Sequence, residues 1–120
     1  MYFEIDNYNA LQEALNRLCS GLAEEDVPNE TVYDSKLVAS ELISNALRHG
    51  GGKAFFSVQV EQDVISLSVR SLDSFRPPDK SILSGRESEH GRGLYIVDTL
   101  VETRRYSEEG GTSVVIRIRR

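Results

Sequence analysis

Two neighbouring stretches of alternating apolar and polar residues, 53-KAFFSVQVEQD-63 and 64-VISLSVR-70, constrain the fold most. Successive side chains of a β-strand point to opposite faces, so a period of two predicts a pair of strands with one buried face. The tight segment 61-EQD-63 predicts that the two strands form a hairpin. The apolar face of such a hairpin has to be covered by another layer of the chain.

Two segments with a helical period are suited to cover that face. Residues 8–23 and about 32–48 place apolar side chains at steps of three and four, which is typical of amphipathic helices. Asn29 or Thr31 is expected to cap the second helix, and Gly50 is expected to end it in a left-handed conformation. The apolar positions are Leu11, Leu15, Leu18 and Leu22 in the first helix and Val32, Ala39, Ile43, Ala46 and Leu47 in the second.

The remaining elements complete an order in which helices and strands are grouped. We expect a short strand at 2–5, a long loop at 71–90 with one helical turn at 79–83, a third helix at 93–102, and a final hairpin of strands 103–109 and 112–119. This grouping predicts an α+β fold, a two-layer α/β sandwich whose mixed sheet is mainly antiparallel and carries its helices on one face. A length of 120 residues suits a single domain over 1–120.

The composition excludes several classes of function. With 39% apolar and 28% charged residues the chain has a soluble, globular composition, and its net charge of −5 argues against direct binding of nucleic acid. The stretch 1-MYFEIDNYNA-10 does not resemble a signal peptide, and no apolar run reaches membrane-spanning length. Because Cys19 is the one cysteine, no internal disulfide can form, which fits a reducing, cytoplasmic location.

The polar side of the second helix admits two interpretations. Asp34, Glu41, Asn45 and Arg48 lie on one side of it, roughly opposite the apolar positions. One interpretation is an ordinary solvated face. The other is a site in which the Asn45 amide oxygen binds Mg²⁺, which prefers oxygen ligands, and the Glu41 carboxylate accepts a proton.

A second stretch, 91-GRGLYIVDTL-100, favours the functional interpretation. Two glycines open the predicted third helix directly after the long loop. The free N–H groups and partial positive charge of a helix N-terminus bind phosphate, and glycine lets the backbone approach it closely. The combination of this helix start, the polar helix and the long loop is more specific than any one of them.

These motifs resemble those of the GHKL (Bergerat-fold) ATPase superfamily, and the resemblance covers about residues 5–118. The stretch 41-ELISNALRHG-50 resembles its N-box, 91-GRGLYIV-97 resembles its second glycine box, and 110-GGT-112 resembles the glycine-threonine element before the last strand. The short single-domain format and the two longer motifs are most similar to the anti-sigma factor serine-protein kinase branch.

The resemblance implies a role for each residue that matches a family motif. Glu41 would orient or deprotonate the attacking hydroxyl, Asn45 would coordinate the Mg²⁺ that bridges the phosphates of ATP, and Thr112 would lie close to the adenine. Residues 71–90 would form the ATP lid. The nucleotide site would further include Arg48 and His49 on the second helix, and Gly91, Arg92, Gly93 and Leu94 at the lid hinge and the start of the phosphate-binding helix.

The resemblance also implies partners. In this branch the attacking hydroxyl belongs to a serine of a STAS-domain anti-sigma factor antagonist, and the kinase sequesters a sigma factor in its ATP-bound state. Members of the branch commonly dimerise, so we expect a homodimer. A histidine-kinase catalytic fragment is a weaker hypothesis, because the sequence shows neither a dimerisation helix pair nor a phosphoacceptor His on a long helix.

The sequence departs from the family at the first glycine box, which normally reads Asp-x-Gly-x-Gly after the central hairpin. In 69-VRSLDSFRPP-78, Ser71 stands where the family has the Asp that binds the adenine amino group. Asp73 and Phe75 stand at the two glycine positions. A frame shifted by two residues places Asp73 in the Asp position but restores no glycine.

This departure leaves two hypotheses open. A neutral Ser hydroxyl accepts a hydrogen bond more weakly than a carboxylate, and larger residues in place of glycine add bulk near the base. We therefore expect nucleotide binding that is weakened, with Ser71 and Asp73 as the candidate contacts to the base, or lost. The first hypothesis is the kinase and anti-sigma factor; the second is a degenerate GHKL module that regulates a partner by contact alone.

Overall fold

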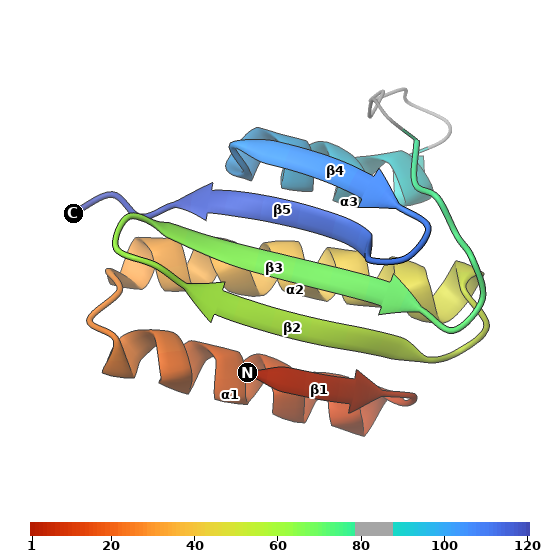
Figure 1. Ribbon diagram of the computed structural model, residues 1–120, viewed down its shortest axis with the longest axis horizontal. Coiled ribbons are helices and arrows are strands. Elements are labelled where there is room, and N and C mark those ends of the chain that lie inside the picture. Colours follow the sequence, from red (N-terminus) through yellow and green to blue (C-terminus); the bar gives the residue numbers. More distant parts are fainter. Residues whose placement is uncertain (79–87) are drawn as a thin grey trace.

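The computed structural model of the chain describes residues 1–78 and 88–120 (Figure 1). Three helices and five strands are found in these residues. In chain order they are β1 (Tyr2–Ile5), α1 (Tyr8–Glu24), α2 (Asn29–His49), β2 (Ala54–Val60), β3 (Val64–Ser71), α3 (Ser88–Leu100), β4 (Thr103–Ser107) and β5 (Gly111–Arg117).

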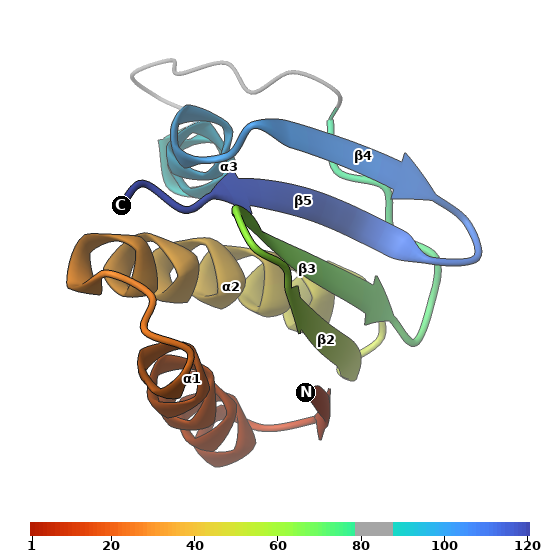
Figure 2. The same cartoon turned by 60° about the vertical axis from the view of Figure 1, so that its left-hand side comes forward.

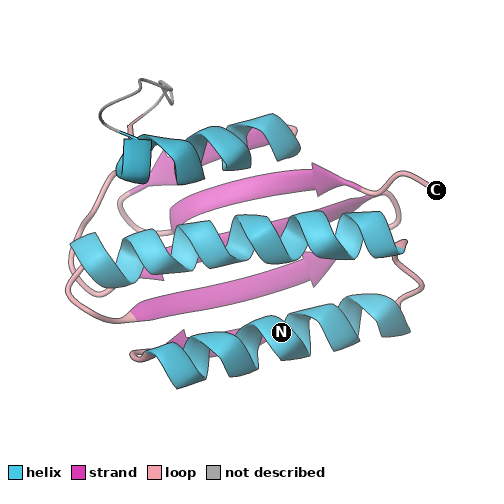
Figure 3. Ribbon diagram, turned by 180° about the vertical axis from the view of Figure 1, so that it is seen from behind, coloured by secondary structure: helices cyan, strands magenta, loops and turns pink. Residues whose placement is uncertain are grey.

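The strands form one sheet in the order β1-β2-β3-β5-β4, and each of its pairings is antiparallel. All three helices lie on the same face of this sheet, with α2 running across its centre and α1 and α3 on either side (Figures 2 and 3). The predicted α+β sandwich with helices on one face is therefore confirmed. The chain reaches the β4 edge through α3 and then returns, so that β5 pairs with β3.

The alternation in the central hairpin produces its two faces as predicted. Phe56 pairs with Val69 and Val58 pairs with Leu67, and all four side chains are buried against the helices. The opposite face carries polar side chains, such as Ser68, whose hydroxyl lies 3.1 Å from that of Ser113 on β5. The helices contribute Leu11, Leu15, Leu18 and Leu22 from α1 and Val38, Ala39, Leu42, Ile43 and Ala46 from α2 to the same core.

The start of α2 differs from the prediction. Pro28, with φ −58° and ψ 146°, is the N-cap residue, and no side chain caps this helix end. The Pro28 carbonyl accepts the bond from the Val32 N–H at 3.0 Å, so the helix begins at Asn29, before the predicted boundary. Asn29 and Thr31 therefore lie inside the first turn, and the expectation that one of them is the cap was wrong.

The end of α2 also differs in its conformation. Gly50 follows the helix as predicted, but its φ of −116° is not left-handed. The left-handed residues are the next two, Gly51 with φ 89° and Gly52 with φ 84°. The Gly50 N–H still donates to the Ala46 carbonyl at 2.8 Å, and the left-handed turn follows one residue later, at Gly51.

The helix α3 begins earlier than the sequence predicts, at Ser88, so Gly91 and Gly93 lie within it rather than at its start. It ends at Leu100, because the Glu102 N–H donates to the Val115 carbonyl at 2.7 Å and draws the chain onto the sheet. The helical turn predicted at 79–83 lies outside the described residues.

Because β2 has one buried and one outer face, replacing its two adjacent phenylalanines should change the free energy of unfolding by very different amounts. Phe56 is fully buried and stacks on Phe3 with ring centroids 5.9 Å apart, so Phe56→Ala should lower the free energy of unfolding by about 3–5 kcal/mol. Phe55 lies on the other face beneath the Arg70 guanidinium, 4.2 Å from its ring centroid, and Phe55→Ala should cost only about 1 kcal/mol. Urea unfolding of both variants measures this, and equal losses would contradict the assignment of faces.

Candidate functional site

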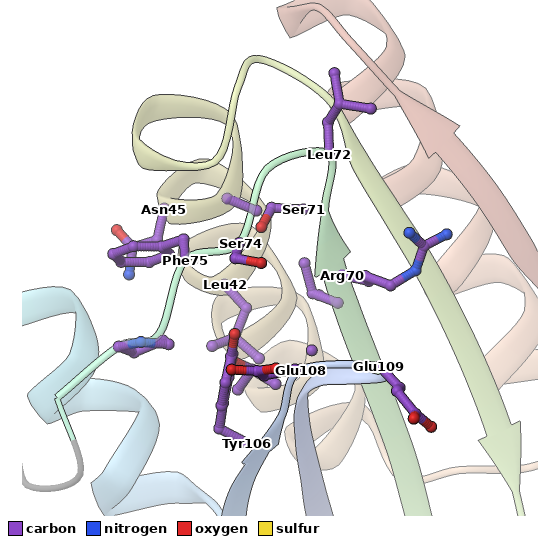
Figure 4. A pocket seen from close by; sticks show the side chains of 15 residues that line it. Leu42, Asn45, Arg70, Ser71, Leu72, Ser74, Phe75, Tyr106, Glu108 and Glu109 are labelled. Atoms are coloured by element: carbon purple, nitrogen blue, oxygen red, sulfur yellow. The ribbon is translucent and has the colours of Figure 1, made fainter.

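A cavity of about 140 Å³ opens where β3 ends and β5 begins, beside the C-terminal half of α2 (Figure 4). Segments far apart in the sequence meet there, because the antiparallel pairing of β3 with β5 brings their ends together. The lining residues are Leu42, Asn45, Ala46, Val69, Arg70, Ser71, Leu72, Ser74, Phe75, Pro77, Tyr106, Glu108, Glu109, Gly111 and Thr112.

Two polar residues stand out in this cavity because they are buried. Asn45 is 8% exposed and Thr112 is 6% exposed, whereas their neighbours Leu42, Ala46 and Val69 are apolar and buried. The Asn45 amide oxygen accepts a hydrogen bond from Arg48 Nη2 at 3.0 Å. A small number of buried polar groups on an apolar floor is the usual composition of a small-molecule site.

The segment after β3 is tied to the end of α2. The Asp73 N–H donates to the Gly50 carbonyl at 2.8 Å, and the Leu72 N–H donates to the Lys53 carbonyl at 2.9 Å. A Cβ on Gly50 would overlap the Ser71 side chain, so this close approach requires a glycine. These contacts fix the direction of the Ser71 side chain.

Ser71 and Asp73, the two candidates for the base contact, lie in different places. Ser71 lines the cavity, and its hydroxyl donates to the Asp73 carbonyl. The Asp73 carboxylate is packed against the backbone of Gly51 and does not line the cavity. Of these two candidates only Ser71 therefore lies at the cavity, and it brings no carboxylate there.

Phe75 lines the cavity near Asn45, and its ring packs against the His49 imidazole with centroids 5.1 Å apart (Figure 4). His49 and Arg48 are exposed and do not line the cavity themselves. Arg48 instead reaches the cavity indirectly, through its hydrogen bond to Asn45.

Glu41 lies one helical turn before Asn45 and is half-buried, and it does not line the cavity. Its carboxylate contacts the backbone of Gly93, so closely that a Cβ at position 93 would overlap it. Leu94 is buried beside this contact. Gly91 and Arg92 belong to α3, but their surroundings lie outside the described residues.

Tyr106, Glu108 and Glu109 also line the cavity, and sequence reasoning missed all three. They come from β4 and the turn that follows it. The signal that could have found them is their place directly before 110-GGT-112, which the family resemblance already assigned to the site.

Asp34, which the helical period placed on the same side of α2 as Glu41 and Asn45, is far from this cavity. It lines a second cavity of about 390 Å³ at the other end of the helix, together with Glu30 and Arg119. Burial raises the pKa of the Asp34 carboxyl and nearby Glu30 raises it further, while Arg119 opposes both effects. Asp34 is therefore not part of the candidate site.

Residues 5–118 match the sequence profile of the histidine kinase-like ATPase domain family. The chain belongs to this family. No curated protein matches the sequence closely enough to be reported as a relative. Membership in this ATPase family agrees with the GHKL resemblance, while the anti-sigma factor branch remains a prediction.

An ATPase of this family is expected to bind ATP and Mg²⁺, and the cavity residues fit these groups in part. Mg²⁺ keeps several waters and takes few protein ligands, so one amide oxygen, that of Asn45, suits it. That oxygen has two lone pairs and can keep its bond to Arg48. Within residues 1–78 and 88–120, no group of three His, Cys, Asp or Glu residues is arranged to hold a metal ion, and no helix could cross a membrane.

The contact between Glu41 and Gly93 predicts a coupled pair of substitutions in this ATPase domain. Replacing a helical glycine by alanine ordinarily stabilises a helix by about 0.5–1 kcal/mol. In the wild-type background Gly93→Ala should give no such gain, because its Cβ displaces the Glu41 carboxylate. In the Glu41→Ala background the gain should return, a coupling of about 1 kcal/mol.

Thermal or urea unfolding of the two single variants and the double variant measures this coupling. The single variant Glu41→Ala is the control for the effect of removing the carboxylate alone. Additive effects of the two substitutions would show that the side chain and the backbone do not touch.

Proposed function

We propose that the chain is an ATP-dependent serine-protein kinase that also sequesters a sigma factor, and that its substrate is a serine of a STAS-domain anti-sigma factor antagonist. The observation that supports a nucleotide site best is the burial of Asn45 and Thr112 in one cavity at the end of the sheet. The resemblance of the two longest motifs to the anti-sigma factor kinase branch supports the choice of partners. The same resemblance supports a homodimer and a cytoplasmic location.

In this proposal several residues in and beside the cavity have defined roles. Leu42, Ala46 and Val69 exclude water from the base, and Thr112 offers it a buried hydroxyl. Asn45 holds Mg²⁺, which neutralises phosphate charge during phosphoryl transfer. Arg48 orients the Asn45 amide, because the amide oxygen has to face the guanidinium for the 3.0 Å hydrogen bond to form.

Glu41 orients the serine hydroxyl of the substrate and accepts its proton. Its carboxylate is held against Gly93, one helical turn from Asn45, so that it lies next to the cavity and outside it. This arrangement suits a group that acts on the attacking oxygen of a partner protein. Positioning and charge neutralisation supply most of the rate of phosphoryl transfer, so few polar groups are needed.

A second candidate function, a binding module that regulates its partner without nucleotide, is favoured by the region after β3. The Ser71 hydroxyl already donates to the Asp73 carbonyl, and it offers the base a neutral acceptor in place of a carboxylate. The Phe75 ring occupies space beside Asn45 that a glycine would leave open. Both features weaken the case for nucleotide binding, and neither weakens the case for binding of a protein partner.

Substitution of Glu41 separates the two functions. In the kinase, Glu41→Gln should reduce transfer of labelled phosphate from ATP to the STAS antagonist by about 10²–10⁴-fold, because the proton acceptor is lost. Binding of the sigma factor and of Mg-ATP should be retained. The matched control is Asp34→Asn on the same helix, which lines the other cavity and should transfer phosphate at the wild-type rate.

If the wild-type protein transfers no phosphate to any STAS partner, the kinase is excluded. A thermal shift with Mg-ATP then decides what remains, since a ligand that binds only the folded state raises the melting temperature. Absence of any shift at millimolar Mg-ATP would leave the binding module as the function.

Ser71→Asp should tighten the binding of Mg-ATP by roughly tenfold, because a carboxylate accepts a hydrogen bond from the adenine amino group more strongly than a hydroxyl does. Isothermal titration of wild type and variant measures the change. Ser74→Asp adds the same charge at another lining position and serves as the control. Equal tightening by both variants would mean that the gain is a general effect of charge and not a contact at position 71.

A further inference from the structure

We propose that Glu108, in the turn between β4 and β5, supplies the carboxylate that position 71 lacks and selects a purine with a 6-amino group over one with a 6-oxo group. This inference rests on the proposed nucleotide site and names a residue that determines its specificity. It answers the question that Ser71 raises, namely what in this cavity can accept a hydrogen bond strongly from a base.

The side of the cavity formed by α2 and the end of β3 contributes no carboxylate. Ser71 offers a neutral hydroxyl whose proton is already donated to the Asp73 carbonyl. The Asp73 carboxylate lies against Gly51, away from the cavity. Glu41 contacts Gly93 and does not line the cavity either.

The opposite side, formed by the β4–β5 turn, contributes two carboxylates, Glu108 and Glu109. Figure 4 shows the Glu108 side chain directed to the space beside Tyr106, whereas the Glu109 side chain points away from it. Within residues 1–78 and 88–120, the Glu108 carboxylate makes no hydrogen bond or ion pair, so both of its oxygens are open to a ligand. Glu108 is therefore the carboxylate that a base in this cavity can reach.

The backbone holds the turn in place over β3. Gly111 has φ 75°, and a Cβ there would overlap the Val69 carbonyl, so the turn approaches β3 as closely as a glycine permits. The Gly110 N–H donates to the Ser107 hydroxyl at 2.9 Å within the turn. Tyr106 pairs with Thr112, a buried residue of the cavity. Glu108 follows Tyr106 by two residues and therefore lies in the turn beside that cavity.

The chemistry of Glu108 selects one class of base. An ionised carboxylate only accepts hydrogen bonds, so it pairs with the exocyclic amino group of adenine. The carbonyl oxygen at the same position of hypoxanthine would face the negative charge without a proton between them, which is unfavourable. The cavity should therefore bind Mg-ATP in preference to Mg-ITP.

Titrations of Mg-ATP and Mg-ITP test this inference on the full chain. For the wild type we expect Mg-ATP to bind roughly tenfold or more tightly than Mg-ITP, because a charge-assisted hydrogen bond is replaced by a contact between two acceptors. In Glu108→Gln the ratio should fall to about threefold or less, because the amide can donate to the carbonyl oxygen of hypoxanthine as well as accept from adenine. Glu109→Gln removes the same charge from the adjacent position and should keep the wild-type ratio.

A second variant tests the same contact from the other side of the cavity. Adding Ser71→Asp to Glu108→Gln should restore the preference for Mg-ATP, because a carboxylate is then present again. The melting temperature of nucleotide-free Glu108→Gln should equal that of the wild type, since the Glu108 carboxylate has no partner to lose among the described residues.

The outcomes separate this inference from the proposed function. If the wild type binds Mg-ATP and Glu108→Gln keeps the full preference over Mg-ITP, the role of Glu108 is overturned and the nucleotide site stands. A wild type that binds neither nucleotide overturns both. An equal loss of preference in Glu108→Gln and Glu109→Gln overturns the assignment as well, because it shows an effect of net charge alone.

Discussion

The candidate site depends on two close contacts, each made by the backbone of a glycine that has no side chain to hold the neighbouring element away. At one, Gly50 at the end of α2 lies against Ser71 at the end of β3. At the other, Gly111 at the start of β5 lies against the Val69 carbonyl. A larger residue at either glycine would separate the elements and widen the cavity between them, because close packing leaves no room for an added Cβ. The helix, the central hairpin and the last hairpin are therefore held at fixed distances around one small space.

Such close packing explains why so few polar groups can define the site. Asn45 and Thr112 come from different elements, yet both are almost fully buried and face the same cavity. The Asn45 amide oxygen keeps its hydrogen bond to Arg48, and a few buried polar groups on an apolar floor are the usual composition of a small-molecule site. Glu41 differs from both, because its contact with Gly93 couples α2 to α3. The geometry thus separates a buried region suited to a base from an outer region suited to an attacking group.

Periodicity was sufficient to predict the architecture from the sequence, and insufficient to predict the boundaries. The alternation of 53–63 and 64–70 and the leucine spacing of 8–23 correspond to elements that bury one face, so local pattern and tertiary packing agree there. The start of α2 was missed because Pro28 accepts the first helical hydrogen bond through its carbonyl, which needs no capping side chain. Periodicity does not identify Tyr106 and Glu108 as cavity residues, because the pairing of β5 with both β3 and β4 carries them there; their place before 110-GGT-112 is the one sequence signal for them.

The glycines near the site also explain how the chain accommodates the side chains at positions 71 and 73, where it departs from the family. Gly51, with φ 89°, packs on the Asp73 carboxylate, and Gly50 packs on Ser71. Each of these contacts is possible only if one of the two residues has no side chain. Here the glycines follow α2, and they leave room for the side chains of the residues that follow β3. The two glycines at the end of α2 thus leave room for the side chains at positions 71 and 73. The segment after β3 brings no carboxylate to the cavity, and on the inference proposed above the last hairpin supplies it through Glu108.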